Sequence, residues 1–344
     1  MSPSPWSRLS LAIGHATDDV GVTGCTVIRG LTEPFRCAAA LIGRASGSRE
    51  LATCMPEHLV DRTDAVLLTG GSAYGLDAAA GVMRWMEAHG RGYPVGQGVV
   101  PIVPAGVIFD LSPLGSFAAR PTPEMAYEAC DRAASDHIAE GCVGAGTGAL
   151  VGKCAGVQWA MKGGVGLGTA EGGGVLAAAI AVVNAFGDVR GSDGRIIAGA
   201  RAPGGGFIDA EAVLRGAGTP TEFAFVASEA RRNTTLALVA VSTPLPKTAL
   251  AQVAQAATAA FHRRITPCGT SFDGDILFAV SPMTSVEHSA SSASHTAATS
   301  IPLARIEAVA IAALEQAIER GVTTARGRDG IPGLADHAGV VDRG

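Results

Sequence analysis

The chain has little of what marks several large classes of protein. Of its 344 residues only 17% are charged and 5% aromatic, the formal net charge is −5, and no run of Lys and Arg exceeds two residues. A strongly basic surface is therefore not expected, which argues against a nucleic-acid partner. The most apolar run, 174–187, is too short to span a bilayer and contains Asn184, so a membrane partner is not expected either.

Cysteine pairs are also missing. The seven cysteines are scattered, no Cys-x-x-Cys pair occurs, and their number is odd. This pattern favours free, mostly buried thiols in a reducing compartment, and it gives so little support to a zinc site that no metal is predicted. The first residues lack the basic stretch and long apolar core of a secretory signal, so we expect a cytoplasmic protein.

Two motifs of well-known sites fail at one or two positions. The stretch around Ser72 would be a nucleophile elbow only with Gly at position 74, which is Tyr74. The stretch 144–154 would be a phosphate-binding P-loop only with Gly in place of Thr147 and Ser or Thr in place of Cys154. No cofactor is therefore expected.

What the chain does have is apolar segments of two kinds. Apolar residues make up 47% of it, enough for a large core. Runs bounded by Gly, Pro or Asp predict strands at 64–70, 99–111, 176–187, 234–242 and 273–281. Segments rich in Ala and Val with narrow polar faces predict helices at 74–90, 122–141, 246–264 and 302–321. Because these elements come in blocks without strict alternation, a layered α+β domain is expected rather than a doubly wound parallel sheet.

The domain organisation predicted from this pattern is simple. No internal repeat and no long linker occurs, so residues 1–322 are expected to form one domain. Within it the small-residue stretch 288–300 is expected to be a loop. The Gly- and Asp-rich residues 323–344 are expected to be a loose C-terminal tail.

The segment RRNTTLALVAVS (231–242) places Asn233 and Thr234 directly before an apolar strand. One interpretation is local, because Asn suits a turn and a β-branched Thr suits a strand start. A second is a glycosylation acceptor at 233–235, which requires a secreted protein. A third makes Thr234 a nucleophile that attacks the carbonyl of Asn233, so that the chain cuts itself and Thr234 becomes a new N-terminus. This window alone does not decide among them.

A second window, TSFDGDILFAVS, places Asp273 and Asp275 at the predicted start of a strand. Alternate residues of a strand point to one face, so the two carboxylates are expected side by side, with Gly274 leaving the other face open. Neighbouring like charges raise at least one pKa, and such a pair shares protons with a nearby hydroxyl or amine. The alternative is a polar turn that leads into the strand, since Asp-Gly is a common turn signal.

The third interpretation of Thr234 needs further groups, and the sequence offers candidates. A threonine hydroxyl is a weak nucleophile, but an N-terminal threonine carries its own base, because an α-amino group has a pKa near ~8. Asn184, inside an otherwise apolar strand, is a candidate donor to a developing oxyanion, or an Asn that pairs with backbone in a turn. Lys153 and Lys162 lie among glycines, and either could line a pocket or be solvated.

Taken together, several ordered motifs resemble one known family. They are LTGGSAYGLDAAAGVMR, VPAGVIFDL and VVNAFGDV, followed by NTTLALVAVS and DGDILFAVS. Over residues 10–322 the chain is similar to the self-processing L-aminopeptidase/D-esterase and β-aminopeptidase family, and most similar to its nylon-oligomer hydrolase branch. The resemblance implies a four-layer αββα sandwich like that of N-terminal-nucleophile hydrolases. It also implies self-cleavage into an α chain (1–233) and a β chain (234–344), and an assembly of four such αβ units.

The resemblance also implies roles for residues. Thr234 would be the nucleophile, Asp273 and Asp275 its catalytic partners, and Asn184 a ligand of the oxyanion or of the substrate amine. The pocket lysine of the family would be Lys153, with Lys162 as the alternative and as a substrate-binding residue. The motifs around Gly71, Ser72 and Phe109 would line the substrate pocket, and Phe109 replaces a tyrosine of some relatives.

The function that the resemblance implies is an N-terminal threonine amidohydrolase or aminopeptidase. Its substrates would be short peptides or ω-amino acid amides, and the reaction would pass through an acyl-enzyme. Two alternatives remain. Ornithine acetyltransferases share this kind of fold and an internal threonine nucleophile, but the chain lacks the Ala-Thr-Met step expected there. A non-catalytic ligand-binding relative would keep the fold and leave the chain uncut.

Overall fold

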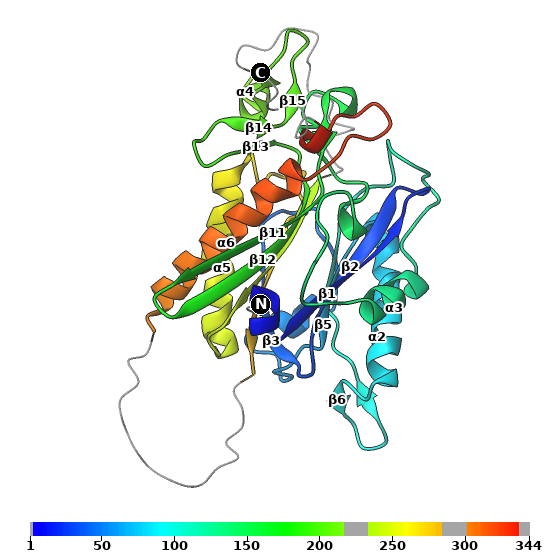
Figure 1. Ribbon diagram of the computed structural model, residues 1–344, viewed down its shortest axis with the longest axis vertical. Helices are drawn as coiled ribbons and strands as arrows, with labels where there is room; N and C mark the ends of the chain where they lie inside the picture. The colour runs from blue at the N-terminus through cyan, green and yellow to red at the C-terminus, as the bar shows by residue number, and fades with distance from the viewer. Residues whose placement is uncertain (1–2, 217–232, 284–300, 337–344) are drawn as a thin grey trace.

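The structure is a computed structural model that describes residues 3–216, 233–283 and 301–336 (Figure 1). Two five-stranded sheets lie face to face. The first has the strand order β1 (Leu11–Asp18), β2 (Thr23–Gly30), β5 (Ala65–Thr69), β8 (Ala105–Val107) and β4 (Gly47–Arg49). The second has the order β11 (Val165–Gly172), β12 (Val175–Asn184), β17 (Thr234–Val241), β19 (Ile276–Pro282) and β3 (Phe35–Leu41).

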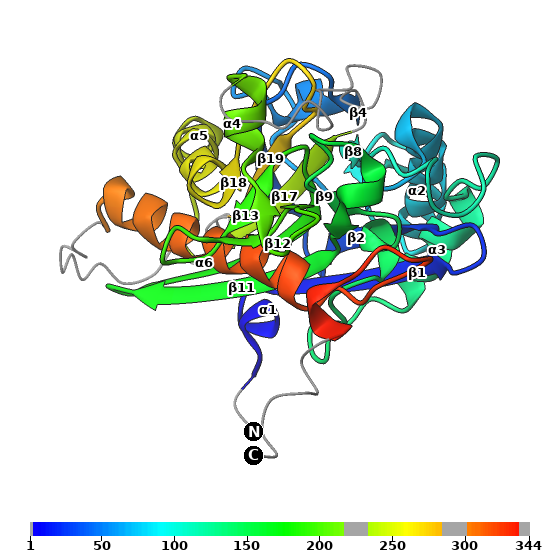
Figure 2. The same ribbon diagram turned by 90° about the horizontal axis from the view of Figure 1, so that it is seen from above.

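Helices cover the outer face of each sheet, which gives the four layers seen from above in Figure 2. The helices α2 (Ala79–Ala88) and α3 (Pro123–Asp131) share an apolar cluster with the first sheet. The long helices α5 (Lys247–Arg264) and α6 (Leu303–Thr323) share another with the second sheet. A third cluster fills the space between the sheets. The predicted four-layer αββα sandwich is thus confirmed.

The burial of strand β17 explains why its sequence is apolar without alternation. Leu236 and Leu238 point into the cluster between the sheets, whereas Ala237 and Val239 point into the cluster under α5 and α6. A strand that is buried on both faces reads as a continuous apolar run. It is the central strand of the sheet, antiparallel to β12 and parallel to β19.

The remaining elements are short. Helix α1 (Pro5–Arg8) and α4 (Ala210–Leu214) are single turns, and Ser72–Ala78 forms a 3-10 helix. The short strands are β6 (Tyr93–Pro94), β7 (Val99–Val100), β9 (Leu150–Val151), β10 (Met161–Lys162), β13 (Asp188–Arg190), β14 (Ile196–Ala198), β15 (Ala200–Arg201), β16 (Phe207–Ile208) and β18 (Ile265–Thr266).

Most predicted elements are present, and the differences have local causes. Three predicted strands are confirmed, at 64–70, 176–187 and 234–242. Two predicted helices are confirmed as well, at 246–264 and 302–321. The strand predicted at 99–111 is wrong as a single strand: only β7 and β8 form, because Pro101 and Pro104 lack the amide hydrogen that a central strand needs. The helix predicted at 122–141 ends at Asp131, because Ala134 pairs with Ile13 of β1 instead.

The chain after α6 also differs from the expected loose tail. Ile331 is buried, and the Lys162 amide donates to the carbonyl of Pro332 at 2.9 Å, so residues 324–336 pack on the body. Residues 337–344 and the loop predicted at 288–300 lie outside the described residues.

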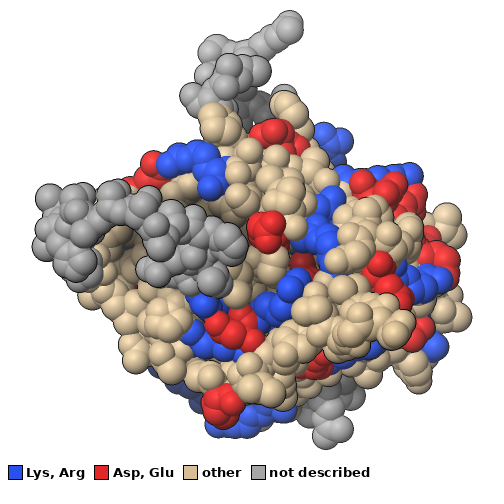
Figure 3. All heavy atoms as spheres, turned by 90° about the horizontal axis from the view of Figure 1, so that it is seen from below, with Lys and Arg blue, Asp and Glu red and all other residues tan. Residues whose placement is uncertain are grey.

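Two features of the structure concern the expected absence of nucleic-acid and membrane partners: the distribution of surface charge and the apolarity of the helices. On the face seen from below, basic and acidic side chains are interspersed among uncharged ones (Figure 3). In the part of the chain that the structure describes, no helix combines the length and apolarity needed to cross a bilayer.

Candidate active site

The register of the second sheet brings the predicted residues together at one end of β17. Thr234 lies opposite Asn184 of β12, and Asn233 forms a parallel bridge with Asp273, just before β19. Asn233, Thr234, Asn184, Asp273 and Asp275 are each 5% exposed or less. Strand pairing therefore assembles in one buried place residues that are far apart in the sequence.

The Asn233 carbonyl is the focus of this cluster. The Thr234 hydroxyl donates to its oxygen at 2.5 Å, and the Gly274 amide donates to the same oxygen at 2.9 Å. A carbonyl that accepts two hydrogen bonds is polarised, and a backbone N–H already aimed at its oxygen is placed to stabilise a negative charge that develops there. The close approach depends on Gly274, because a Cβ at that position would lie 2.6 Å from Thr234 Oγ1.

The two aspartates do not start strand β19, as the sequence suggested, but precede it, and each has its own donors. Asp273 Oδ2 accepts from the Thr270 amide at 2.9 Å and from the Thr270 hydroxyl at 2.8 Å. Asp275 Oδ1 accepts from the Thr235 amide at 2.6 Å, and Asp275 Oδ2 lies 3.6 Å from the Cys268 thiol that donates to it. Neither carboxylate is hydrogen-bonded to the Thr234 hydroxyl, whose proton points to the Asn233 carbonyl.

These surroundings give the two carboxyls different acidities. Burial raises the pKa of Asp275 to about 7, and the charge of Asp273 adds to that rise. Burial also raises the pKa of Asp273, while the two hydrogen bonds from Thr270 and the positive charge of Lys153 act in the opposite direction. Hydrogen bonds lower the pKa of both carboxyls, but only Asp273 also has the positive charge of Lys153, so Asp273 ionises first and Asp275 keeps its proton to a higher pH.

This difference predicts a pH-dependent stability. Because the folded-state pKa of Asp275 lies above its ordinary value of 3.8, the stability contributed by the neutral carboxyl is complete below pH 4 and is lost as the pH rises through about 7. An Asp275→Asn variant has no such loss. We therefore expect the variant to gain stability over its parent as the pH rises from 4 to 8, by at least about 1 kcal/mol, since one pKa unit corresponds to about 1.4 kcal/mol.

The measurement is chemical unfolding at several pH values, with both proteins carrying Thr234→Ala so that both chains are continuous. The raised pKa values of Asp110 and Asp188 are common to the two proteins and cancel in the difference. A difference that stays constant between pH 4 and pH 8 would show that Asp275 does not titrate there.

Lys153 lies at the site and is held by Asn184. Its ammonium donates to the backbone carbonyl of Asn184 at 3.0 Å and to the side-chain Oδ1 at 2.9 Å, and only 3% of the residue is exposed. Asn184 Oδ1 also accepts from the Leu150 amide at 3.0 Å, and its Nδ2 donates to the Phe109 carbonyl at 3.3 Å. In the uncut chain Asn184 thus positions Lys153 where its charge lowers the pKa of Asp273.

Lys162, predicted as a substrate-binding residue, has a different place. It is fully buried, and its ammonium donates to the carbonyls of Thr147 and Ala149 at 2.9 and 2.7 Å. Burial lowers the pKa of Lys162 to about 8. An ammonium enclosed in this way holds the backbone before β9 and is not accessible to a substrate, so the prediction is wrong for Lys162.

A cavity of about 250 Å³ opens in front of Thr234. Its walls are Ala45, Ser46, Gly47, Ser72, Ala73, Val107, Ile108, Phe109, Asn233 and Thr234. Ser72 and Phe109 line it as predicted, whereas Gly71 forms the turn behind the wall, with a φ of 80°. The Gly71 amide donates to Asp110 Oδ1 at 2.6 Å, and this bond fixes the position of Ser72.

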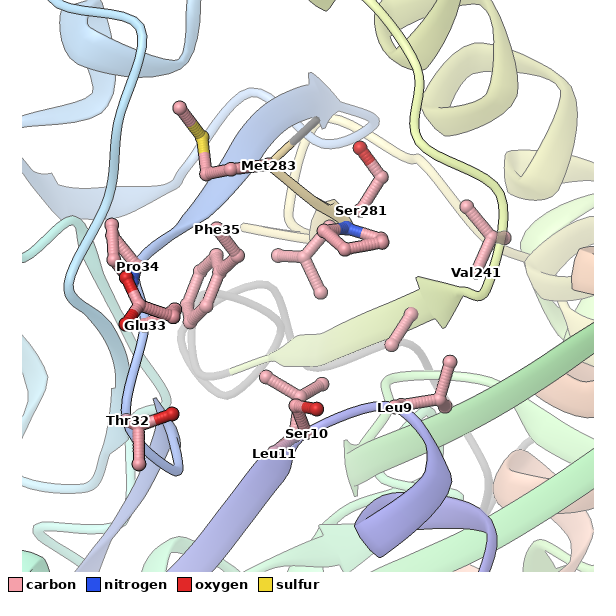
Figure 4. A pocket seen from close by; sticks show the side chains of 13 residues that line it. Leu9, Ser10, Leu11, Thr32, Glu33, Pro34, Phe35, Val241, Ser281 and Met283 are labelled. Carbon is pink, nitrogen blue, oxygen red and sulfur yellow. The ribbon is translucent and has the colours of Figure 1, made fainter. Parts of the chain in front are cut away.

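A larger cavity of about 500 Å³ lies beside Val241, at the other end of β17 (Figure 4). Its walls include Leu11, Phe35, Val241 and Val280, which are apolar, with Glu33 at one side. Val241 ends the strand that Thr234 begins, so the two cavities are separated by roughly 20 Å along β17. The larger cavity contains none of the clustered polar residues.

Sequence reasoning missed several groups of the site. The donors Thr270 and Cys268 precede the aspartates within a few residues, and a Thr three positions before an Asp is a turn signal that could have indicated the first of them. The role of the Gly274 amide follows only from the bridge between Asn233 and Asp273. Nothing in the sequence pointed to Ala45–Gly47 as a wall of the cavity.

Comparison with known proteins identifies the family of the chain. The family model of peptidase family S58 matches residues 10–335. An uncharacterized aminopeptidase of Mycobacterium bovis is 38% identical over 306 residues, which are 86% of this chain and 84% of the relative. The 6-aminohexanoate-oligomer endohydrolase of a Kocuria species is 28% identical over 283 residues, which are 78% of this chain and 72% of the relative.

Solved structures show the same fold. The L-aminopeptidase D-Ala-esterase/amidase of Ochrobactrum anthropi, described as a variant of the Ntn hydrolase fold, superposes with a TM-score of 0.66 at 17% identity, over 96% of this chain and 90% of that one. A β-aminopeptidase of a Burkholderia species gives a TM-score of 0.64 at 18% identity, over 100% and 96%. With the family model covering nearly the whole chain, the protein belongs to peptidase family S58 and is a hydrolase of the aminopeptidase type.

Proposed function

We propose that the protein activates itself by cutting the Asn233–Thr234 bond, and that Thr234 then acts as the N-terminal nucleophile of an amidohydrolase or aminopeptidase. The observation that carries this proposal is the Asn233 carbonyl, which accepts hydrogen bonds from both the Thr234 hydroxyl and the Gly274 amide. The Gly274 bond belongs to the parallel bridge between Asn233 and Asp273, whereas the Thr234 hydroxyl aimed at the preceding carbonyl is not part of any strand pairing.

The cutting step balances with the groups at the site. Thr234 Oγ1 forms a bond to the carbonyl carbon of Asn233, and its proton passes to the ionised Asp273, directly or through one water. The Gly274 amide stabilises the oxyanion. The C–N bond then breaks as the proton returns to the departing nitrogen of Thr234, which leaves an ester between Asn233 and the Thr234 hydroxyl. Water hydrolyses this ester and releases the Asn233 carboxylate and the Thr234 α-amine.

The cut creates the catalyst. The new α-amine has an ordinary pKa of about 8 and takes the proton of the Thr234 hydroxyl as it attacks a substrate amide. Asp275, next to Thr235, and Asp273 hold this amine, and Lys153 balances their charge. The leaving amine departs, the acyl group stays on Thr234, and water releases it.

The expected substrates are short. The cavity of about 250 Å³ holds one small acyl unit, and the buried aspartates suit a substrate with a free amino group near the scissile bond. The names of the relatives, aminopeptidase and 6-aminohexanoate-oligomer endohydrolase, fit short amino-terminated amides. We therefore propose small-amino-acid amides, short peptides and ω-amino acid oligomers as the substrate class.

The first test is the state of the chain itself. Purified protein should contain two polypeptides, and the smaller should begin Thr-Thr-Leu-Ala. Intact mass and N-terminal sequencing make the measurement, and dilution provides the control, because an intramolecular cut proceeds at a rate that does not depend on concentration. A single chain near 34.5 kDa after long incubation would contradict the proposal and favour a non-catalytic relative.

A further inference from the structure

Near the cavity of Thr234 lies an arginine for which the described residues provide no counter-ion. The cavity wall made by Ser72 and Ala73 continues directly into Tyr74, whose side chain is exposed, and the guanidinium carbon of Arg120 lies 3.6 Å from the centre of the Tyr74 ring. Pro121 is packed against Gly71, at 2.9 Å from where a Cβ of that glycine would be. The pair of Arg120 and Tyr74 is therefore held next to the segment that contributes Ser72 and Ala73 to the cavity wall.

The hydrogen-bonding capacity of Arg120 is not used within the described residues. It makes no ion pair or hydrogen bond there, and its buried Nε has no hydrogen-bond partner. Most other arginines of the fold are paired, for example Arg84 with Glu124 and Arg132 with Glu128. Stacking on an aromatic ring holds a guanidinium in place while its N–H groups remain available in its plane.

The chemistry that fits this arrangement is a carboxylate. A guanidinium presents parallel N–H groups that bind both oxygens of a carboxylate, and such charge-assisted pairs are among the strongest hydrogen bonds in proteins. The aspartates of the site suit the amino end of a substrate. The carboxylate of a short peptide or of an ω-amino acid oligomer lies at the other end, on the fragment that leaves.

We propose that Arg120, held on the ring of Tyr74, binds the free carboxylate of the substrate's leaving fragment and so makes the enzyme selective for short amides that end in a carboxylate. This inference rests on the proposed hydrolase function of Thr234. It adds a specificity-determining residue outside the cluster of Thr234, Asp273 and Asp275.

The test uses matched pairs of substrates. L-alanyl-ω-amino acids with one to five methylene groups are compared with the corresponding primary carboxamides, together with L-alanine p-nitroanilide, which has no carboxylate. Wild-type enzyme should prefer the carboxylate at one spacer length. At that length Arg120→Gln should raise KM for the carboxylate by roughly 10- to 100-fold, as expected for a lost hydrogen bond to a charged group. Turnover of the carboxamide and the p-nitroanilide should change less than about twofold.

Further variants separate a specific role from a loss of charge. Arg120→Lys should recover only part of the preference, because a lysine keeps the charge but not the planar pair of N–H groups. Arg132→Gln removes an exposed arginine elsewhere and should leave both substrates unaffected. Thermal unfolding of each variant reports on folding.

The outcomes distinguish this inference from the proposed function. If wild type cuts itself and hydrolyses the p-nitroanilide but treats carboxylates and carboxamides alike, the inference is wrong and the hydrolase function stands. An equal loss on both substrates in Arg120→Gln also contradicts it, because the residue would then serve the structure. If wild type neither cuts itself nor hydrolyses any amide, the proposed function fails, and the inference fails with it.

Discussion

Thr234→Ala should leave the chain uncut and abolish hydrolysis of amino-terminal amides. Both losses have one cause, since the hydroxyl that donates to the Asn233 carbonyl in the uncut chain is the nucleophile after the cut. Intact mass follows the cut, and release of p-nitroaniline from L-alanine p-nitroanilide follows hydrolysis. We expect loss of activity to the background of the assay, which corresponds to a fall of at least about 10³-fold.

The neighbouring residue provides a matched control. Thr235→Ala removes a hydroxyl and a methyl group, as Thr234→Ala does, but at the next residue of the chain. The backbone amide of residue 235 still donates to Asp275. The Thr235 hydroxyl has no hydrogen-bond partner among the residues that the structure describes, so this variant should cut itself and remain active. Thr234→Ser should cut more slowly but completely.

If Thr234→Ala stays uncut and yet hydrolyses the amide at the wild-type rate, Thr234 is not the catalyst. If wild type releases the acyl group only when an amine acceptor is added, the enzyme is a transferase.

Gly274→Ala should slow the chain cut by about 10²- to 10³-fold, the usual cost of disturbing one donor to an oxyanion. The added Cβ would lie 2.6 Å from Thr234 Oγ1 and 2.8 Å from the Ala45 carbonyl oxygen, so the hydroxyl, the amide or both must move. The rate of appearance of the Thr234 N-terminus in freshly purified protein makes the measurement.

The control here is Gly98→Ala, because no atom lies within 4 Å of a Cβ at that position. This variant should cut itself at the wild-type rate. Thermal unfolding of Gly274→Ala shows whether the fold is kept. A folded variant that cuts at the normal rate would remove the Gly274 amide from the mechanism.

Local sequence signals predicted the parts of this site that depend on local chemistry. Thr234 before an apolar strand and Asp273 in a second window are both recognisable without a structure. The choice between Lys153 and Lys162 could not be made from the sequence, because both lie among glycines and differ only in their tertiary surroundings. Lys153 contacts Asn184, whereas Lys162 contacts the carbonyls of Thr147 and Ala149.

For the fold as well, local features could be predicted from the sequence and long-range pairing could not. Helices such as α5 and α6 have long periodic patterns and were predicted nearly to the residue. The pairing of Asn184 with Thr234, and of Asn233 with Asp273, depends on the register of strands that are far apart in sequence, and register is set by the packing of whole faces. The Gly274 amide could therefore not be inferred from the sequence as a partner of the Asn233 carbonyl.

The strand order of the second sheet has a consequence for how the two halves of a cut chain stay together. Its order is β11, β12, β17, β19 and β3, so the two strands that follow Thr234 are enclosed on both sides by strands that precede it. A separate 234–344 fragment would hold two central strands without their neighbours, and a separate 1–233 fragment would lack the middle of its sheet. The peptide link at Thr234 is therefore needed while the sheet assembles, because it makes the search for interleaved partners intramolecular. Once the sheet has closed, backbone ladders on both sides of β17 and β19 replace that link, and the two polypeptides should separate only by global unfolding.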